Sequence, residues 1–189
     1  MPPRGLTGGR NSLEELLIQN ACIIDGTGSP GFMGSLTVSG ARITGIWKDP
    51  WYNIPARERL DSAGMVLCPG FVDTHTHSDM VLLHDGRQPA SITQGVTTEI
   101  LGQDGLSYAQ LSPDNLRSYV LYLKGIDGMF CDVPLDFTST EQYLSRFEGK
   151  TGVNVAYLVP HCALRLETVG FENRLLTPSE MMLAQTMLR

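Results

Sequence analysis

The segment from Cys68 to Asp79, CPGFVDTHTHSD, constrains the fold more than any other part of the chain. Its Pro-Gly turn leads into an apolar run, which predicts a buried strand over residues 70–76. His75 and His77 occupy positions i and i+2, so on a strand they share one face, about 6–7 Å apart along the backbone. Two imidazoles on one face can hold a divalent metal ion. The alternative is that backbone groups satisfy both histidines.

The predicted secondary structure changes at this segment. Residues 15–67 are predicted to be β-structure, with a hairpin at Ser39-Gly40. After Pro69, strands alternate with helices. We expect strands at about 70–76, 97–101 and 153–159, and helices at about 80–93 (broken at Pro89), 113–123, 138–147 and from 178 onwards. Such alternation is typical of an α/β fold with a parallel sheet, in which ligand sites form at the carboxyl ends of the strands.

Composition limits the partners of the chain. Its 189 residues carry a net charge of −6 and form no dense cluster of Lys and Arg, which argues against a nucleic-acid partner. There is no apolar run of transmembrane length and no secretory signal, so we expect no membrane partner. The four cysteines lie far apart and fit reduced thiols in a cytoplasmic protein.

Two segments together, residues 69–79 and 92–107, resemble the amidohydrolase superfamily of metal-dependent hydrolases. Within it the chain is similar to the N-acyl-D-amino-acid deacylases, or D-aminoacylases, from about Leu16 to about Leu166. The resemblance implies a (β/α)8 TIM-type barrel beside a small β-sandwich. We therefore expect a flexible tail at 1–14, a partial sandwich at 15–68 and the first three or so β/α units of a barrel at 69–189.

A complete barrel needs roughly 250 residues, so the chain is expected to be a truncated, N-terminal portion. The resemblance implies hydrolysis of non-peptide C–N bonds, specifically deacylation of N-acyl-D-amino acids, with one or two zinc ions as cofactor and a small N-acyl amino acid as the molecule bound. It places two more histidines and a general-base aspartate beyond residue 189, so this portion alone is expected to be inactive. The alternatives are cyclic-amide or dipeptide hydrolysis, or a non-catalytic protein that associates through its open barrel edge.

By the same resemblance, His75 and His77 are metal ligands. The turn Gly102-Gln103-Asp104-Gly105 has Asp104 where D-aminoacylases carry a metal-binding cysteine. A carboxylate is also a zinc ligand, and it is harder than a thiolate, which favours oxygen-preferring ions. The alternative is an ordinary turn residue between two glycines.

Four further residues complete the predicted site. His161 follows the third strand and is expected at the mouth of the barrel, where it and Arg165 are candidates for binding substrate. Asp73 and Asp79 are candidates for orienting the imidazoles from a second layer of contacts. For each of these residues a purely structural role is the alternative.

Overall fold

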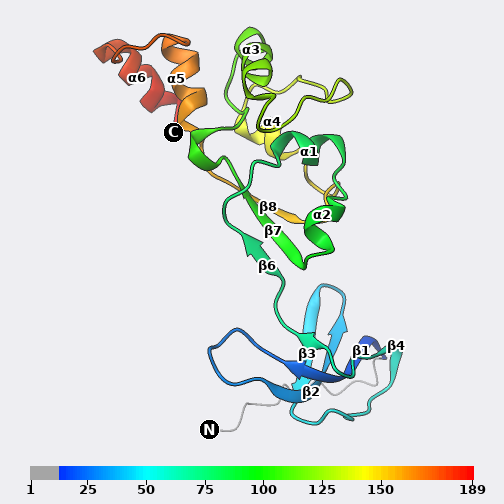
Figure 1. The fold of residues 1–189 in the computed structure, drawn as a ribbon. Coiled ribbons are helices and arrows are strands. Elements are labelled where there is room, and N and C mark those ends of the chain that lie inside the picture. The colour runs from blue at the N-terminus through cyan, green and yellow to red at the C-terminus, as the bar shows by residue number, and fades with distance from the viewer. Residues whose placement is uncertain (1–12) are drawn as a thin grey trace. The chain divides into compact units, whose positions relative to one another are not determined.

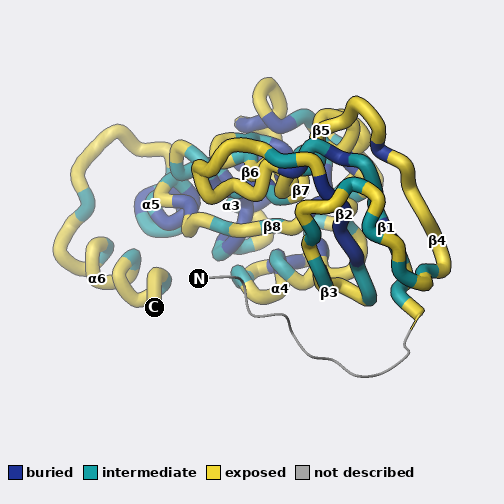
Figure 2. The backbone as a smooth tube through the Cα atoms, turned by 90° about the horizontal axis from the view of Figure 1, so that it is seen from below, coloured by how far each residue is buried: buried dark blue, intermediate teal, exposed yellow. Residues whose placement is uncertain are grey.

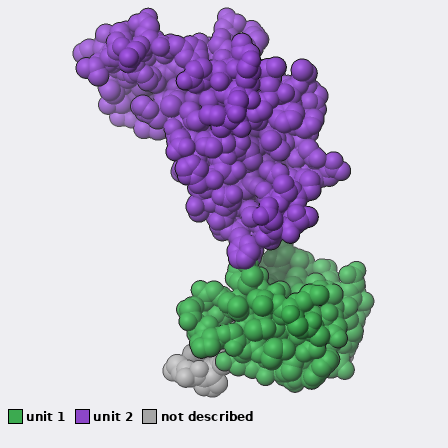
Figure 3. All heavy atoms as spheres, in the orientation of Figure 1, with its two compact units in different colours: residues 1–69 green, residues 70–189 purple. Residues whose placement is uncertain are grey.

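The computed structural model describes residues 13–189, which divide after Pro69 into two compact units (Figure 3). The boundary falls inside the Pro-Gly turn that precedes the first strand of the α/β part. Each unit has a hydrophobic cluster of its own. None of the helices in the described part of the chain is long and apolar enough to cross a membrane.

The first unit is a five-stranded mixed sheet (Figure 1). Its strands are β1 (Glu14–Ile23), β2 (Phe32–Ser39), β3 (Arg42–Trp47), β4 (Ala56–Asp61) and β5 (Val66–Leu67). β2 pairs antiparallel with β1 and β3, which confirms the predicted hairpin. β4 and β5 both pair parallel with β1.

Strand β1 changes partner along its length. Asn20, with φ +60°, lies at the irregularity between Ile18 and Ala21 in the pairing with β2. The half before Asn20 pairs with β4, and the half after it pairs with β5. Ala21, Ile23 and Leu36 form the buried cluster on this sheet. Residues 13–69 supply one sheet, so the β-sandwich, which needs a second layer, stays a prediction.

The second unit is built on a parallel sheet in the order β6-β7-β8 (Figure 1). Its strands are β6 (Phe71–Asp73), β7 (Val96–Leu101) and β8 (Asn154–Tyr157). The helices are α1 (Asp79–His84), α2 (Pro89–Ile92), the 3-10 turn η1 (Gln103–Gly105), α3 (Pro113–Leu123), α4 (Thr140–Leu144), α5 (His161–Val169) and α6 (Pro178–Met187). Both strand pairs are parallel, so the expected α/β class is confirmed.

Helix α3 shows why the pattern in this unit could be predicted. Its buried residues Leu116, Tyr119, Val120 and Leu123 follow the i, i+3, i+4, i+7 spacing of one helix face. Pro113 stands at the first helical position, where its missing N–H is not needed. The helix begins and ends where the sequence predicted.

The expected strand over 70–76 is wrong in its extent, because β6 ends at Asp73. The Oδ1 atom of Asp73 accepts a hydrogen bond from the backbone N–H of His75 at 3.1 Å, which turns the chain out of the sheet. His75 and His77 therefore lie in the connection to α1 and not on the strand. The expected helix at 138–147 is also shorter, spanning only α4.

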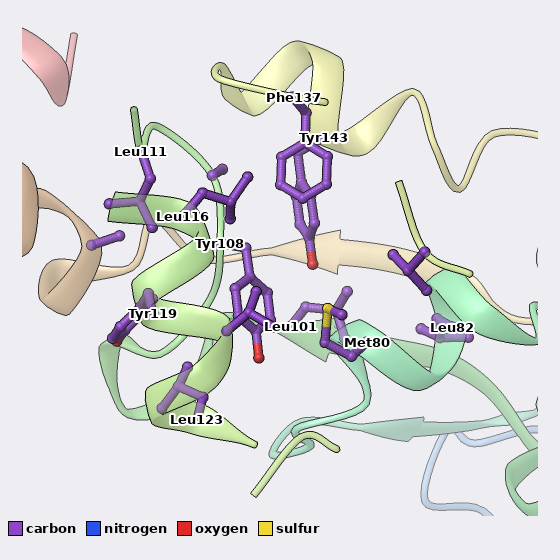
Figure 4. Close-up of a cluster of buried hydrophobic side chains, with 14 of the residues drawn as sticks. Met80, Leu82, Leu101, Tyr108, Leu111, Leu116, Tyr119, Leu123, Phe137 and Tyr143 are labelled. Carbon is purple, nitrogen blue, oxygen red and sulfur yellow. The ribbon is translucent and has the colours of Figure 1, made fainter. Parts of the chain in front are cut away.

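The core of the second unit lies between the sheet and helices α1, α3 and α4 (Figure 4). Its largest fully buried side chains are Tyr108, Tyr143, Phe137, Met80, Leu101, Leu111, Leu116 and Leu123. Figure 2 shows that α5 also carries buried residues, whereas none of the residues of α6 is buried.

The three parallel strands bring their carboxyl ends to the same edge of the sheet. The segment with His75 and His77 leaves β6 there, the turn with Asp104 leaves β7, and His161 follows β8. Because this edge is where ligand sites form in α/β folds, the fold gathers most of the predicted site residues in one region.

Candidate metal centre

Three side chains converge at the edge of the sheet. His75, His77 and Asp104 each offer one ligand atom, and these atoms all lie within 4.8 Å of one another. The Nε2 atom of His75 is 3.1 Å from Oδ2 of Asp104, and the Nε2 atom of His77 is 3.3 Å from the same oxygen. The two imidazole rings are 5.7 Å apart, centre to centre. Two nitrogens and one oxygen thus face a common point.

The backbone of η1 turns sharply to present Asp104. This residue has φ +55°, in the left-handed region that Asp tolerates better than most residues. The neighbouring Gly102 and Gly105 also have positive φ, +82° and +76°. A hydrogen bond from His75 lowers the pKa of the Asp104 carboxyl below its usual value, which keeps the carboxylate ionised.

The site is open on one side and packed on the other. The side chains of His75 and Asp104 are 60% and 59% exposed, whereas that of His77 is only 23% exposed. An incoming molecule can therefore approach past His75 and Asp104, while His77 is held within the protein.

The buried side of His77 meets a carboxylate that the sequence did not predict as part of the site. Nδ1 of His77 lies 4.0 Å from Oδ1 of Asp127, in the turn that follows α3. Tyr108 donates a hydrogen bond of 2.7 Å to the other oxygen of Asp127. Burial raises the pKa of Asp127, although the bond from Tyr108 acts in the opposite direction. Asp127 is 50 residues from His77 between two glycines, so no local pattern indicated it.

The two aspartates predicted to orient the imidazoles make other contacts. Asp73 binds the backbone N–H of His75. Asp79 is fully buried at the start of α1 and accepts hydrogen bonds from the hydroxyls of Ser107 and Tyr143. Burial raises the pKa of Asp79 to about 6. Neither carboxylate is hydrogen-bonded to an imidazole ring, so the structure places Asp73 at a turn and Asp79 in the core.

His161 and Arg165, the predicted substrate-binding pair, lie on α5. A Cβ atom added to Gly105 would come within 3.3 Å of His161, so the start of α5 packs against the turn that carries Asp104. The guanidinium of Arg165 instead donates to the main-chain carbonyls of Glu172 and Arg174. His161 is thus brought next to the turn that carries Asp104, whereas Arg165 holds the segment after α5. A substrate contact of either residue stays a prediction.

No family model matches the chain. Among curated proteins, it is 33% identical over 167 residues to an N-acyl-D-aspartate deacylase from Alcaligenes xylosoxydans xylosoxydans, covering 88% of this chain and 32% of that enzyme. It is 34% identical, again over 167 residues, to a D-aminoacylase from the same organism, of which it covers 33%. The chain therefore spans about a third of the length of the curated relatives that it matches.

Solved structures give the same result. The zinc and phosphonate complex of N-acyl-D-glutamate deacylase from Bordetella bronchiseptica superposes with a TM-score of 0.78 at 30% identity, over 94% of this chain and 36% of that one. Over the third or so of their length that it spans, the chain is similar to N-acyl-D-amino-acid deacylases. A structure of D-aminoacylase, an enzyme with a binuclear metal centre, superposes with a TM-score of 0.76, also at 30% identity. The resemblance stated from the two sequence segments is thus confirmed.

The converging residues of this deacylase-like chain fit a zinc ion. Imidazole nitrogens and carboxylate oxygens are ordinary zinc ligands, and the chain presents two of the former and one of the latter within a few ångströms. The buried Nδ1 atom of His77 has no hydrogen-bond partner. A zinc-binding imidazole usually has a carboxylate or carbonyl acceptor behind its second nitrogen, and Asp127 stands at that position.

Proposed function

We propose that this chain carries part of the metal centre of an amidohydrolase that removes the acyl group from N-acyl-D-amino acids. One observation carries the proposal, namely the convergence of His75, His77 and Asp104 where β6 and β7 end. The relatives named above act on N-acyl-D-aspartate and N-acyl-D-glutamate, which supports an N-acyl amino acid as substrate. In this proposal the three β/α units belong to a (β/α)8 barrel.

The roles of the chain's own residues follow from the geometry. The Nε2 atoms of His75 and His77 and the carboxylate of Asp104 would hold the metal. A divalent ion supplies Lewis acidity, which lowers the pKa of water and polarises an amide carbonyl. The exposed sides of His75 and Asp104 leave room for the substrate, and the start of α5, with His161, packs against the turn that carries Asp104. The general base would be an aspartate beyond residue 189.

The proposed location is the cytoplasm. All four cysteines are free thiols in the structure. Free thiols are usual in reducing compartments, whereas secreted proteins generally pair them.

A second candidate function rests on the surface of α6. Met181, Met182, Leu183 and Leu188, on or next to this helix, are all exposed apolar residues. Such a surface favours association with another subunit. Light scattering of the 189-residue protein tests this candidate. A stable, monodisperse oligomer would support it, and aggregation would count against it.

The catalytic proposal is tested on the product of the complete reading frame that contains residues 1–189. We would load it with zinc and measure hydrolysis of N-acetyl-D-aspartate, N-acetyl-D-glutamate and N-acetyl-D-leucine beside a panel of cyclic imides. Hydrolysis of the D-substrates supports deacylation, and hydrolysis of the imides alone supports the cyclic-amide alternative.

Two histidine variants test whether activity depends on the metal centre. The double variant His75→Ala/His77→Ala should lose activity and zinc together. The variant His84→Ala is the matched control, because His84 is paired with Asp132 away from the three converging residues and should keep full activity. If the double variant keeps both zinc and activity, the proposal is wrong.

A further inference from the structure

We infer that Asp127 is a positioning residue for His77, holding its imidazole so that Nε2 presents a free electron pair to the metal. This inference rests on the proposed function, because it takes His77 to be a metal ligand. It adds to the site a residue that does not contact the metal and that lies in the turn after α3.

Two buried atoms without partners face each other here. Nδ1 of His77 and Oδ1 of Asp127 are each buried and each lack a hydrogen bond within the described chain. They are 4.0 Å apart. An imidazole N–H is a donor and a carboxylate oxygen an acceptor, so each supplies what the other lacks. A movement of about 1 Å would bring them to hydrogen-bond distance.

The carboxylate of Asp127 is held firmly enough to direct a ring. Its second oxygen accepts a 2.7 Å hydrogen bond from the hydroxyl of Tyr108, which is fully buried. Its own backbone N–H donates to the carbonyl of Leu123 at the end of α3. The position of Asp127 is therefore fixed by the core of the unit and not by the metal site.

The consequence for His77 concerns which ring nitrogen carries the proton. A neutral imidazole has one N–H and one free electron pair, and only the free pair can bind a metal. An acceptor behind Nδ1 stabilises the tautomer with the proton on that atom, which leaves Nε2 free. Asp104 draws the ring proton toward Nε2 from the other side, at 3.3 Å. Asp127 opposes that pull and keeps His77 ready to bind.

The variant Asp127→Asn tests this role with little change of shape. The Tyr108 hydroxyl can still donate to the amide oxygen, but the amide NH2 would now face Nδ1 as a donor. We expect the His77 tautomer to shift toward a proton on Nε2, seen in the ring ¹⁵N chemical shifts of the zinc-free 189-residue protein. We also expect its affinity for zinc alone to fall about 10- to 100-fold.

The matched control is Asp132→Asn. Asp132 is also a carboxylate beside an imidazole, 2.9 Å from Nδ1 of His84, but it lies outside the three converging residues. Its replacement should leave zinc affinity and the His77 spectrum unchanged. If Asp127→Asn does not fold, Tyr108→Phe is the second variant, because it keeps the carboxylate of Asp127 and removes the hydrogen bond that holds it. It should shift the His77 tautomer and the zinc affinity in the same direction as Asp127→Asn, by a smaller amount.

The two proposals fail in different ways. A wild-type protein that binds no zinc contradicts the proposed function, while the ¹⁵N spectrum of the zinc-free protein still tests Asp127. An unchanged His77 tautomer, together with zinc affinity within twofold of wild type, in a folded Asp127→Asn or Tyr108→Phe protein overturns the positioning role.

Discussion

At the scale of single residues, Asp104 determines the chemistry of the candidate metal centre. Its carboxylate is the one oxygen donor among the three converging groups. The resemblance implies a metal-binding cysteine at this place, and a thiolate is a softer donor that favours zinc over manganese. Asp also suits the left-handed backbone of η1, with φ +55°, so in the proposed centre the same residue would serve both the turn and the metal.

Replacing Asp104 by Cys should change metal preference. We expect the ratio of zinc affinity to manganese affinity to rise at least about tenfold, because thiolate is softer than carboxylate. Isothermal titration of both ions into the wild type and the variant measures this ratio.

Asp104→Asn serves as the control, since Asn accepts the same backbone conformation but lacks the charge. It should weaken the binding of zinc and of manganese without changing which of the two ions binds more tightly. An unaltered ratio in Asp104→Cys would show that Asp104 is a turn residue only.

At the scale of elements, the site depends on how closely the turn after β7 approaches β8. Gly102 has φ +82°, and a Cβ atom placed on it would lie 2.1 Å from the carbonyl oxygen of Leu158. The backbone of η1 can take up its position only because this residue has no side chain.

Gly102→Ala should therefore lower the free energy of unfolding by about 3 kcal/mol or more, from the left-handed backbone and the clash together. Gly149→Ala is the matched control, because Gly149 also has positive φ, +65°, but has no atom within 4 Å of the added Cβ. That change should cost only about 1 kcal/mol. If urea denaturation gives the same loss of unfolding free energy for both variants, the close approach of the Leu158 carbonyl to Gly102 is contradicted.

The stability of the N-terminal turn of α6 should depend on pH. The side chain of Arg174 and the backbone N–H of Thr177 lower the pKa of Glu180 from 4.5 to about 2. The folded state binds a proton on Glu180 less tightly than the unfolded state does. The stabilisation that ionised Glu180 gives to the folded state is therefore complete above about pH 4.5 and is lost as pH falls through 2. Amide protection factors of α6 should thus decrease between about pH 5 and pH 2.

Glu180→Gln removes the titrating group and should make the protection of α6 low and nearly independent of pH in that range. Protection in the wild type that stays constant down to pH 2 would refute the role of Glu180. The capping box itself, in which Thr177 and Glu180 bind each other's backbone N–H, agrees with the predicted start of this helix.

The sequence predicted the elements that have a local signal and missed those that lack one. The starts of α3 and α6 follow from Ser112-Pro113 and Thr177-Pro178. Helix α5 was not predicted, because it begins directly after Pro160 with no side chain capping its N-terminus. The end of β6 was placed too late, because the apolar run and the His-x-His spacing favoured a longer strand than the local turn allows. In that turn the Asp73 side chain accepts a hydrogen bond from the N–H of His75, two residues further on.

For the site, the predictable part was the set of residues that follow strand ends. His75 and His77 were named from their i, i+2 spacing on an expected strand, and Asp104 from the resemblance, which implies a metal-binding residue in its turn. The structure brings the three together although both histidines follow β6 and do not lie on it. Asp127 could not be named, because it reaches His77 only through packing of the segment after α3. A buried carboxylate between Gly125 and Gly128 has the same sequence pattern as a surface turn.

At the scale of the whole molecule, the described chain supplies three ligand atoms at one point, but not a complete catalytic set. Of its four histidines, two are in the candidate metal centre, His84 is paired with Asp132, and His161 begins α5. The resemblance assigns two further histidines and an aspartate to later strands of the barrel.

The 189-residue protein by itself should therefore bind zinc but show no deacylase activity above the background of free zinc. Release of amine from N-acetyl-D-glutamate measures this directly, with the zinc-loaded product of the complete reading frame as positive control. Turnover by residues 1–189 alone at a rate comparable to that control would mean that the described residues include a general base that the structure does not indicate.

His75, His77 and Asp104 together should bind a metal ion. The most direct test is anomalous diffraction at the zinc edge from crystals of the 189-residue protein grown with zinc. We expect a peak about 2.0–2.2 Å from the Nε2 atoms of both histidines and from an oxygen of Asp104. No peak between these three side chains at saturating zinc, or zinc bound only elsewhere on the protein, would contradict it.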